Sequence, residues 1–190
     1  GFEKHWTMKQ AEKDVIPNVG TTLYNEGIYV GYRYFESANK AVSYPFGYGL
    51  SYTAFDYLKA KISGSGKNFT ATVTVKNTGS TVGKEVIELY VTAPKGALEK
   101  PVCELKAFAK TKELQPGEMQ TLKLSFSNYD LASYDEAQQA WVTDAGTYQA
   151  KFGTSVDEIK LTVPFKVSKN KVACHNVMAP DKQLDKLTLK

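Results

Sequence analysis

Residues 159–167 have the sequence IKLTVPFKV, in which every second residue is apolar. Successive side chains of a β-strand point to opposite faces, so this alternation predicts a strand with one dry face and one wet face. Pro164 lies inside this run and has no backbone N–H to donate to a neighbouring strand. It therefore predicts that the strand lies at the edge of a sheet or contains a bulge.

The same alternation recurs upstream, which indicates that residues 159–167 are one strand among several. It appears in residues 68–75, 86–91, 121–126 and 148–152. Turn signals lie between these runs, including QPGE at 115–118 and DAG at 144–146. Strands with one dry face are stable only when two sheets stack dry face to dry face. Residues 53–168 are therefore predicted to form a β-sandwich of about seven strands, of the immunoglobulin or fibronectin type III kind.

The dry positions of these strands predict the core of the sandwich. We expect the following side chains to be buried: Val73, Val75, Ile87, Leu89, Leu122, Leu124, Phe126, Tyr148, Phe152, Leu161 and Val163.

The flanking segments differ in character from the sandwich. Residues 1–52 mix polar sequence with aromatic runs, and residues 169–190 are polar, basic and weakly patterned. Residues 27–35, GIYVGYRYF, are apolar enough to predict a buried strand whose glycines allow close backbone approach. Residues 45–52, PFGYGLSY, predict a loop without regular structure. If Arg33 lies in a buried strand, it needs a salt bridge or a cation–π contact, and we expect that partner in another domain.

The composition excludes several classes of protein. The chain has 190 residues, 42% of them hydrophobic and 23% charged, which is typical of soluble globular proteins. The net charge of +4 is carried mainly by the C-terminal tail, so no basic patch predicts nucleic-acid binding. No apolar stretch reaches the length of a membrane-spanning helix.

Cysteine and histidine offer little chemistry. The two cysteines, Cys103 and Cys174, lie far apart and the chain has only two histidines, so we expect no zinc site. Cys174 and His175 are adjacent and make a poor nucleophile–base pair, because neighbours on a strand face opposite ways. A disulfide between the cysteines stays open beside the alternative of two buried thiols.

Four acidic residues stand in adjacent pairs that resemble catalytic carboxylates. Asp135 and Glu136 form one pair, and Asp157 and Glu158 form the other. Neighbours in sequence do not converge on one substrate, so we interpret them as turn or surface residues. Glu26, at the start of an aromatic run, is interpreted as a residue that orders a domain junction.

Aromatic residues form 12% of the chain, and exposed rings can stack on sugar rings. Trp6, Tyr134 and Trp141 are the candidates for such a carbohydrate platform. Core packing or contact with another domain is the interpretation we favour for Trp141, because it lies beside Val142 in a strand-like run.

Two motifs carry a resemblance to a known family. Residues 26–35, EGIYVGYRYF, and 44–53, YPFGYGLSYT, closely resemble the C-terminal part of glycoside hydrolase family 3 enzymes, and the second motif is very specific to them. The similarity continues through residues 75–79, 83–91, 100–108, 114–118 and 141–148, which look like the fibronectin type III-like domain of that family. It covers roughly residues 24 to 167.

The resemblance implies a larger parent enzyme. Family members join a (β/α)8 barrel, an α/β sandwich domain and this module, and most of them remove β-linked glucose or xylose with retention. Their nucleophilic Asp lies on the barrel and their acid/base Glu usually lies in the second domain. Neither motif is present here, so we expect a non-catalytic C-terminal fragment with no catalytic, cofactor-binding or metal-binding residue.

The resemblance also implies interaction partners and a cellular location. Residues 1–52 would be the end of the α/β domain, and the rest of the parent hydrolase would be the partner, which brings the oligosaccharide substrate. Contact in a homodimer stays open, and a periplasmic or secreted location is implied for bacterial members. The alternatives are an independent carbohydrate-binding module, a protein-interaction module, or a β-xylosidase parent.

Overall fold

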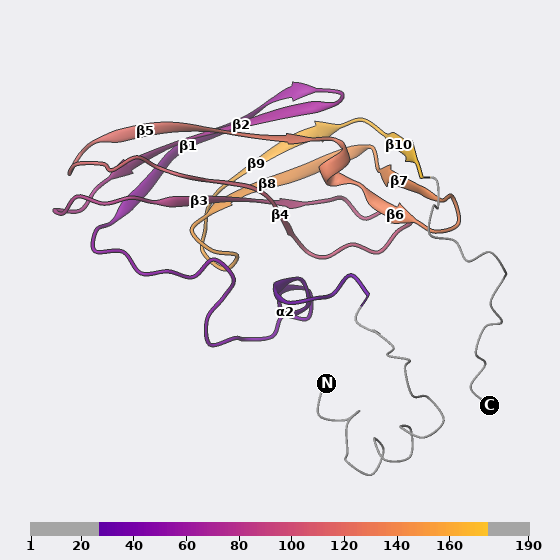
Figure 1. Cartoon of the computed structure of the whole chain (residues 1–190), viewed down its shortest axis with the longest axis horizontal. Coiled ribbons are helices and arrows are strands. Elements are labelled where there is room, and N and C mark those ends of the chain that lie inside the picture. The colour runs from indigo at the N-terminus through magenta and orange to yellow at the C-terminus, as the bar shows by residue number, and fades with distance from the viewer. Residues whose placement is uncertain (1–26, 175–190) are drawn as a thin grey trace, which may run out of the picture.

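The alternating segments form the strands of two facing sheets (Figure 1). This computed structural model describes residues 27–174. Its helices and strands are α2 (Tyr32–Ser37), β1 (Phe55–Ser65), β2 (Asn68–Asn77), β3 (Val86–Thr92), β4 (Glu104–Lys110), β5 (Met119–Ser127), the 3-10 helix η2 (Tyr129–Leu131), β6 (Ser133–Asp135), β7 (Ala140–Thr143), β8 (Gly146–Gly153), β9 (Ile159–Val167) and β10 (Asn170–Ala173).

The sheet topology confirms the β-sandwich prediction. One sheet has the order β1-β2-β5 and the other has the order β4-β3-β8-β9, with all neighbours antiparallel. A smaller sheet, β10-β7-β6, lies at one end of the molecule. β9 is an outer strand of its sheet, and this confirms the position that Pro164 predicts.

The core lies between the two larger sheets. Most of the predicted core residues are buried there, and Phe69, Phe126 and Phe165 pack ring to ring at centroid distances of 5.3–5.7 Å. Leu122, Leu161 and Val163 are less buried than predicted. All three are half-buried and pack against the margin of the core. All three belong to β5 or β9, the outer strands of their sheets, where a side chain is covered by a neighbour on one side only.

Residues 27–35 do not form the predicted strand. Gly27 and Gly31 have positive φ values of 57° and 59°, and α2 begins directly after Gly31. A left-handed residue interrupts an extended strand, and glycine adopts that conformation without steric cost. Tyr32, Tyr34 and Phe35 therefore lie on a short helix and not on a sheet. Residues 45–52 form the irregular loop that the sequence predicts.

The outer face of β3 departs from the alternation rule. Glu88 and Tyr90 occupy positions that the alternation assigns to the wet face, yet both are buried. Figure 1 shows α2 on the side of β3 and β4 away from β1, β2 and β5. A second buried cluster lies beneath it and contains Tyr90, Cys103 and Val156, with Tyr32 packed against them.

The strand β10 lies beyond the sandwich boundary at residue 168 that the sequence suggests. Asn170–Ala173 pair with β7, and the backbone N–H of Cys174 donates to the carbonyl of Gln139. These residues lack an alternating pattern, because β10 packs little of its surface and its side chains are mostly exposed.

Candidate interdomain face

Tyr32 joins α2 to the sandwich. Its ring stacks on Phe46 with 4.7 Å between centroids and meets Tyr90 edge-on at 6.0 Å. Its hydroxyl oxygen accepts a hydrogen bond of 2.8 Å from the backbone N–H of Leu105 in β4. One side chain therefore binds the helix, the following loop and two strands of the four-stranded sheet.

Backbone contacts hold the same segment at two further points. The N–H of Val156, in the turn between β8 and β9, donates to the carbonyl of Phe46 over 2.9 Å. The N–H of Val102, before β4, donates to the hydroxyl of Ser37 over 3.1 Å. Residues 32–46 are thus anchored on the sandwich at several separate places.

A buried hydrogen bond lies under the loop. The Tyr90 hydroxyl donates to Glu88 Oε2 over 2.5 Å. Burial raises the pKa of the Glu88 carboxyl, and the hydrogen bond from Tyr90 opposes part of that shift. Gly47 crosses above with a φ of 86°, and a Cβ at this position would overlap the Glu88 carboxylate. The sequence therefore needs glycine here for both conformation and space.

Arg33 finds its partner inside the chain, which corrects the expectation of a buried strand residue paired with another domain. Its side chain is half-exposed on α2, and its Nε lies 3.3 Å from Glu104 Oε1. Lys106 Nζ contacts the other carboxylate oxygen of Glu104 at 3.0 Å. A pair this open to solvent stabilises the fold by at most about 1 kcal/mol.

Glu36 and Asp157 meet across the same contact region. Burial raises the pKa of Glu36 most, and the hydrogen bond with Asp157 and the repulsion between the two carboxyls raise it further. The sequence pairs Asp157 with its neighbour Glu158, but the structure brings it to α2, and Glu158 instead contacts Lys160 over 2.5 Å.

The segment also presents several large apolar side chains to solvent. Leu50 is 90% exposed and Tyr52 is 99% exposed. We call the exposed set the aromatic face, and it consists of Tyr34, Phe35, Tyr44, Phe46, Tyr48, Leu50 and Tyr52. An exposed apolar patch of this kind, held on rigid anchors, is typical of a surface that packs against another protein or domain.

In the other acidic pair, Asp135 is held by a turn. Asp135 accepts hydrogen bonds from the backbone and side-chain amides of Gln138, and these lower its pKa. Glu136 follows it in the turn between β6 and β7. The remaining predicted candidates, Glu26 and Trp6, lie outside the described residues.

Comparison with known proteins places this architecture. Residues 85–156 match the family model described as a fibronectin type III-like domain. The chain is 44% identical over 170 residues to beta-glucosidase A of Butyrivibrio fibrisolvens, a match that covers 77% of this chain and 20% of the relative. The solved GH3 beta-glucosidase of Bifidobacterium adolescentis superposes with a TM-score of 0.74 at 30% identity, over 92% of this chain and 25% of that one. This chain contains a fibronectin type III-like domain and is similar to one part of these β-glucosidases.

A third relative supports the same assignment. Beta-glucosidase 3B of Thermotoga neapolitana, solved in complex with glucose, superposes on the fibronectin type III-like chain with a TM-score of 0.79 at 39% identity. The superposition covers 84% of this chain and 23% of that structure. The chain therefore spans about a fifth of the length of the curated relatives it matches.

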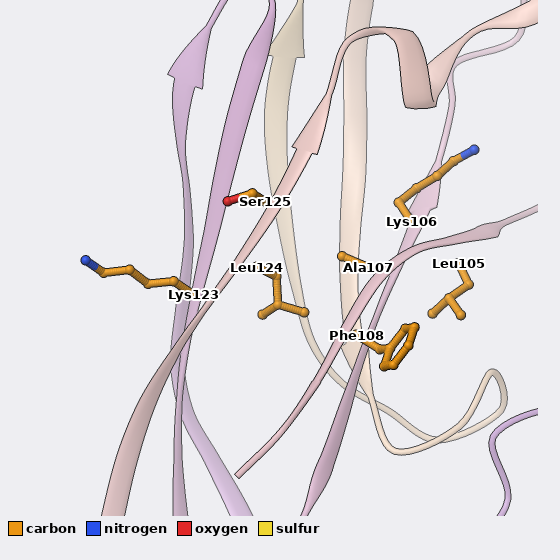
Figure 2. A pocket seen from close by; sticks show the side chains of 7 residues that line it. All are labelled: Leu105, Lys106, Ala107, Phe108, Lys123, Leu124 and Ser125. Carbon is orange, nitrogen blue, oxygen red and sulfur yellow. The ribbon is translucent and has the colours of Figure 1, made fainter. Parts of the chain in front are cut away.

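The seam between the two sheets of the fibronectin type III-like domain is partly open. A hollow of about 420 Å³ lies between β4 and β5. Figure 2 shows its lining side chains, with the Lys123 amine directed away from β4. Phe108, on the outer strand β4, is 69% exposed beside the hollow. Its polar lining consists of Lys106, Lys123 and Ser125, with no acidic or histidine side chain.

The two cysteines are both free thiols. Cys103 is buried under α2, and burial raises its pKa to about 11. Cys174 is half-buried at the end of β10. Within residues 27–174, no three His, Cys, Asp or Glu side chains gather closely enough to hold a metal ion. None of the helices in this part of the chain is long and apolar enough to cross a membrane.

Proposed function

We propose that this chain is the non-catalytic C-terminal accessory portion of a retaining family 3 glycoside hydrolase. The parent would be a β-glucosidase that acts on β-linked gluco-oligosaccharides. Two facts support this proposal: the similar proteins are named β-glucosidases, and the chain spans only about a fifth of their length.

The observation that carries the proposal is the aromatic face. Leu50 and Tyr52 are almost fully exposed, while Tyr32 and Phe46 in the same segment are fastened to the sandwich. Burying an exposed leucine or tyrosine side chain is worth about 1.5–3 kcal/mol. A segment that is rigid on one side and apolar on the other is suited to join two domains.

The division of labour follows from this geometry. Retaining hydrolysis needs a nucleophilic carboxylate and an acid/base carboxyl about 5–5.5 Å apart. In this proposal the barrel and the α/β domain supply that pair, and residues up to 52 are the end of the α/β domain. The sandwich then braces the α/β domain through the aromatic face and contributes stability without touching the substrate bond.

The decisive experiment compares the full-length parent with the isolated chain. In the parent, Leu50→Ser combined with Tyr52→Ser should lower the melting temperature by several degrees, because the face loses apolar contact. The same two substitutions should leave the unfolding of the isolated chain unchanged, because both side chains already face solvent.

Phe108→Ser is the matched control in both proteins, because Phe108 is exposed on β4 and not on the aromatic face. An unchanged melting temperature in the doubly substituted parent would overturn the bracing role. Removal of residues 53–168 from the parent should likewise destabilise it. Unchanged stability and turnover after this removal would also contradict the bracing role.

A second assay addresses the chemistry. The isolated chain should not hydrolyse p-nitrophenyl β-glucoside or β-xyloside above a mock-purified control. The full-length parent should prefer the glucoside, whereas preference for the xyloside would favour the β-xylosidase alternative. Turnover by the chain alone would contradict the proposal, and Glu26 would then be the first residue to replace.

The family resemblance supports two further parts of the proposal. A periplasmic or secreted location is tested by fractionating cells that express the full-length parent. A homodimer is tested by sedimentation of the full-length parent. Because the aromatic face packs against the α/β domain in this proposal, the dimer contact would lie on another surface.

A further inference from the structure

Three aromatic side chains gather at the end of the molecule formed by η2, β6 and β7. Trp141 of β7 lies between Tyr129 of η2 and Tyr134 of β6, with ring centroids 5.8 Å and 5.4 Å away. Tyr129 is 48% exposed and Tyr134 is 42% exposed, and Trp141 is half-buried between them. The sequence suggests Tyr134 and Trp141 as sugar-stacking residues, but it does not place Tyr129 beside them.

These rings form one wall of a groove of about 970 Å³, which we call the β6–β7 groove. The opposite wall comes from residues 27–29, from Arg33 and from the segment that leads into β4. Charged side chains at the groove are Arg33, Glu99, Glu104, Lys106, Asp130, Asp135 and Glu136, so acidic groups outnumber basic ones. This charge balance disfavours nucleic acid and other polyanions as occupants.

Several polar groups of the groove have no partner within the described part of the chain. Among residues 27–174, no side-chain hydrogen bond engages the hydroxyls of Tyr129 and Tyr134, the indole N–H of Trp141 or the carboxylate of Glu136. The neighbouring carboxylate of Asp135 is instead occupied by the backbone N–H of Gln138 at 3.0 Å.

A groove with apolar ring faces and free donors and acceptors has the chemistry of a saccharide site. The hydroxyls of a β-linked glucopyranose are equatorial, so both faces of its ring present C–H bonds that can pack on an aromatic ring. Its hydroxyls lie at the ring edge, where carboxylate, phenol and indole groups can reach them. Ligand sites generally combine apolar walls with a few convergent polar groups in this way.

We propose that the β6–β7 groove binds a β-linked gluco-oligosaccharide through Trp141, Tyr129 and Tyr134. The identity of the sugar rests on the proposed function, whereas the site itself rests on the groove. The oligosaccharide packs against the exposed rings, and Glu136 accepts a hydrogen bond from a sugar hydroxyl. This surface is separate from the aromatic face, so the chain can brace its parent and hold substrate at the same time.

The test is calorimetric titration of the 190-residue chain with cellohexaose. We expect binding with a dissociation constant in the millimolar range or tighter, and at least tenfold weaker binding for Tyr134→Ala and for Tyr129→Ala. Glu136→Gln should weaken binding less, because an amide still accepts one hydrogen bond. Tyr52→Ala, an exposed tyrosine on the aromatic face, is the matched control and should bind like the native chain.

Both groove tyrosines are half-exposed, so the melting curves of their variants should match the native curve and show that the fold is intact. No heat and no shift of the Trp141 indole signal in nuclear magnetic resonance spectra at about 10 mM cellohexaose would overturn the proposal. Binding unchanged in Tyr134→Ala would do the same. Xylohexaose and maltohexaose test the sugar class, and tighter binding of either one would refute the β-glucan assignment.

This outcome is separable from that of the proposed function. Loss of sugar binding leaves the melting experiment on the aromatic face untouched, and Leu50→Ser with Tyr52→Ser should leave the titration unchanged.

Discussion

The hydroxyl of Tyr32 on α2 accepts the backbone N–H of Leu105 on β4, while its ring stacks on Phe46. The contact joins a short helix, none of whose residues is buried, to a strand more than 70 positions later in the chain. Together with the hydrogen bonds that Phe46 and Ser37 accept, it fixes segment 32–46 on the sandwich.

Tyr32→Ala should destabilise the chain by about 1–3 kcal/mol, because it removes a stacked ring pair and leaves a backbone N–H without its partner. Urea unfolding measures this loss. Tyr52→Ala removes a ring that is 99% exposed and should change stability by about 0.5 kcal/mol or less. Equal effects of the two substitutions would show that Tyr32 does not anchor the segment.

Leu89→Ala and Leu124→Ala should each cost about 2–5 kcal/mol, because both side chains are buried between the two sheets. Leu58→Ala is the control, since Leu58 lies on β1 but is 48% exposed. Chemical denaturation supplies the comparison. Losses below about 1 kcal/mol for both core variants would mean that the register of the strands is wrong.

Gly47→Ala should cost about 1–3 kcal/mol, because it places a side chain at a φ of 86° and pushes it into the Glu88 carboxylate. Gly66→Ala separates the two causes. Gly66 also has a positive φ, 72°, but a Cβ there meets nothing within 4 Å. The difference between the two variants in thermal unfolding measures the cost of the clash with Glu88. Equal destabilisation of the two variants would show that this clash contributes nothing.

Glu88→Gln should remove a pH dependence of stability. Burial raises the folded-state pKa of Glu88 above the ordinary value of 4.5. The folded chain then holds a proton that the unfolded chain has released, so this group's contribution to stability falls as the pH rises from about 4.5 through the raised pKa. Between pH 4.5 and the raised pKa, the free energy of unfolding of Glu88→Gln should therefore increase relative to that of the native chain.

Above the raised pKa, the difference between the two Glu88 curves should be constant. Glu113→Gln is the control for the loss of one carboxylate at an exposed position. A Glu88→Gln curve parallel to the native one would contradict the raised pKa of Glu88.

Cys103 should resist alkylation in the folded chain. It is buried, and its pKa of about 11 leaves little thiolate at pH 8. Cys174 is half-buried and should react first, so intact-mass analysis should show one modification early and a second only in denaturant. Simultaneous modification of both thiols would show that α2 does not cover Cys103.

The interior of the sandwich could be predicted from the sequence because strand alternation is local. Each residue of 68–75 or 159–167 has its face set by its neighbours along the chain, and two such faces must be buried against each other. The margin of the core was harder, since Leu122 and Leu161 alternate correctly but lie on outer strands. Their exposure depends on strand order, which no single segment contains.

The candidate sites depend on the tertiary fold even more than the core does. Among the groove residues, Tyr134 and Trp141 are visible in the sequence as aromatic residues, but Tyr129 joins them only through the fold of η2 against β7. Asp157 has Glu158 as its neighbour in sequence and Glu36 as its partner in space. A pair of side chains brought together from distant elements has no local signature.

The sequence by itself determined the strands in which apolar residues alternate, which of their faces are dry, and that residues 45–52 form a loop. Hydrogen-bonded strands repeat every two residues, so this information is written along the chain. Only the tertiary structure decided that 27–35 turns into α2, that Glu88 and Tyr90 are buried, and that the aromatic face is left exposed. Burial of an outer sheet face depends on what packs over it, and that is a contact between distant segments, not a property of the strand.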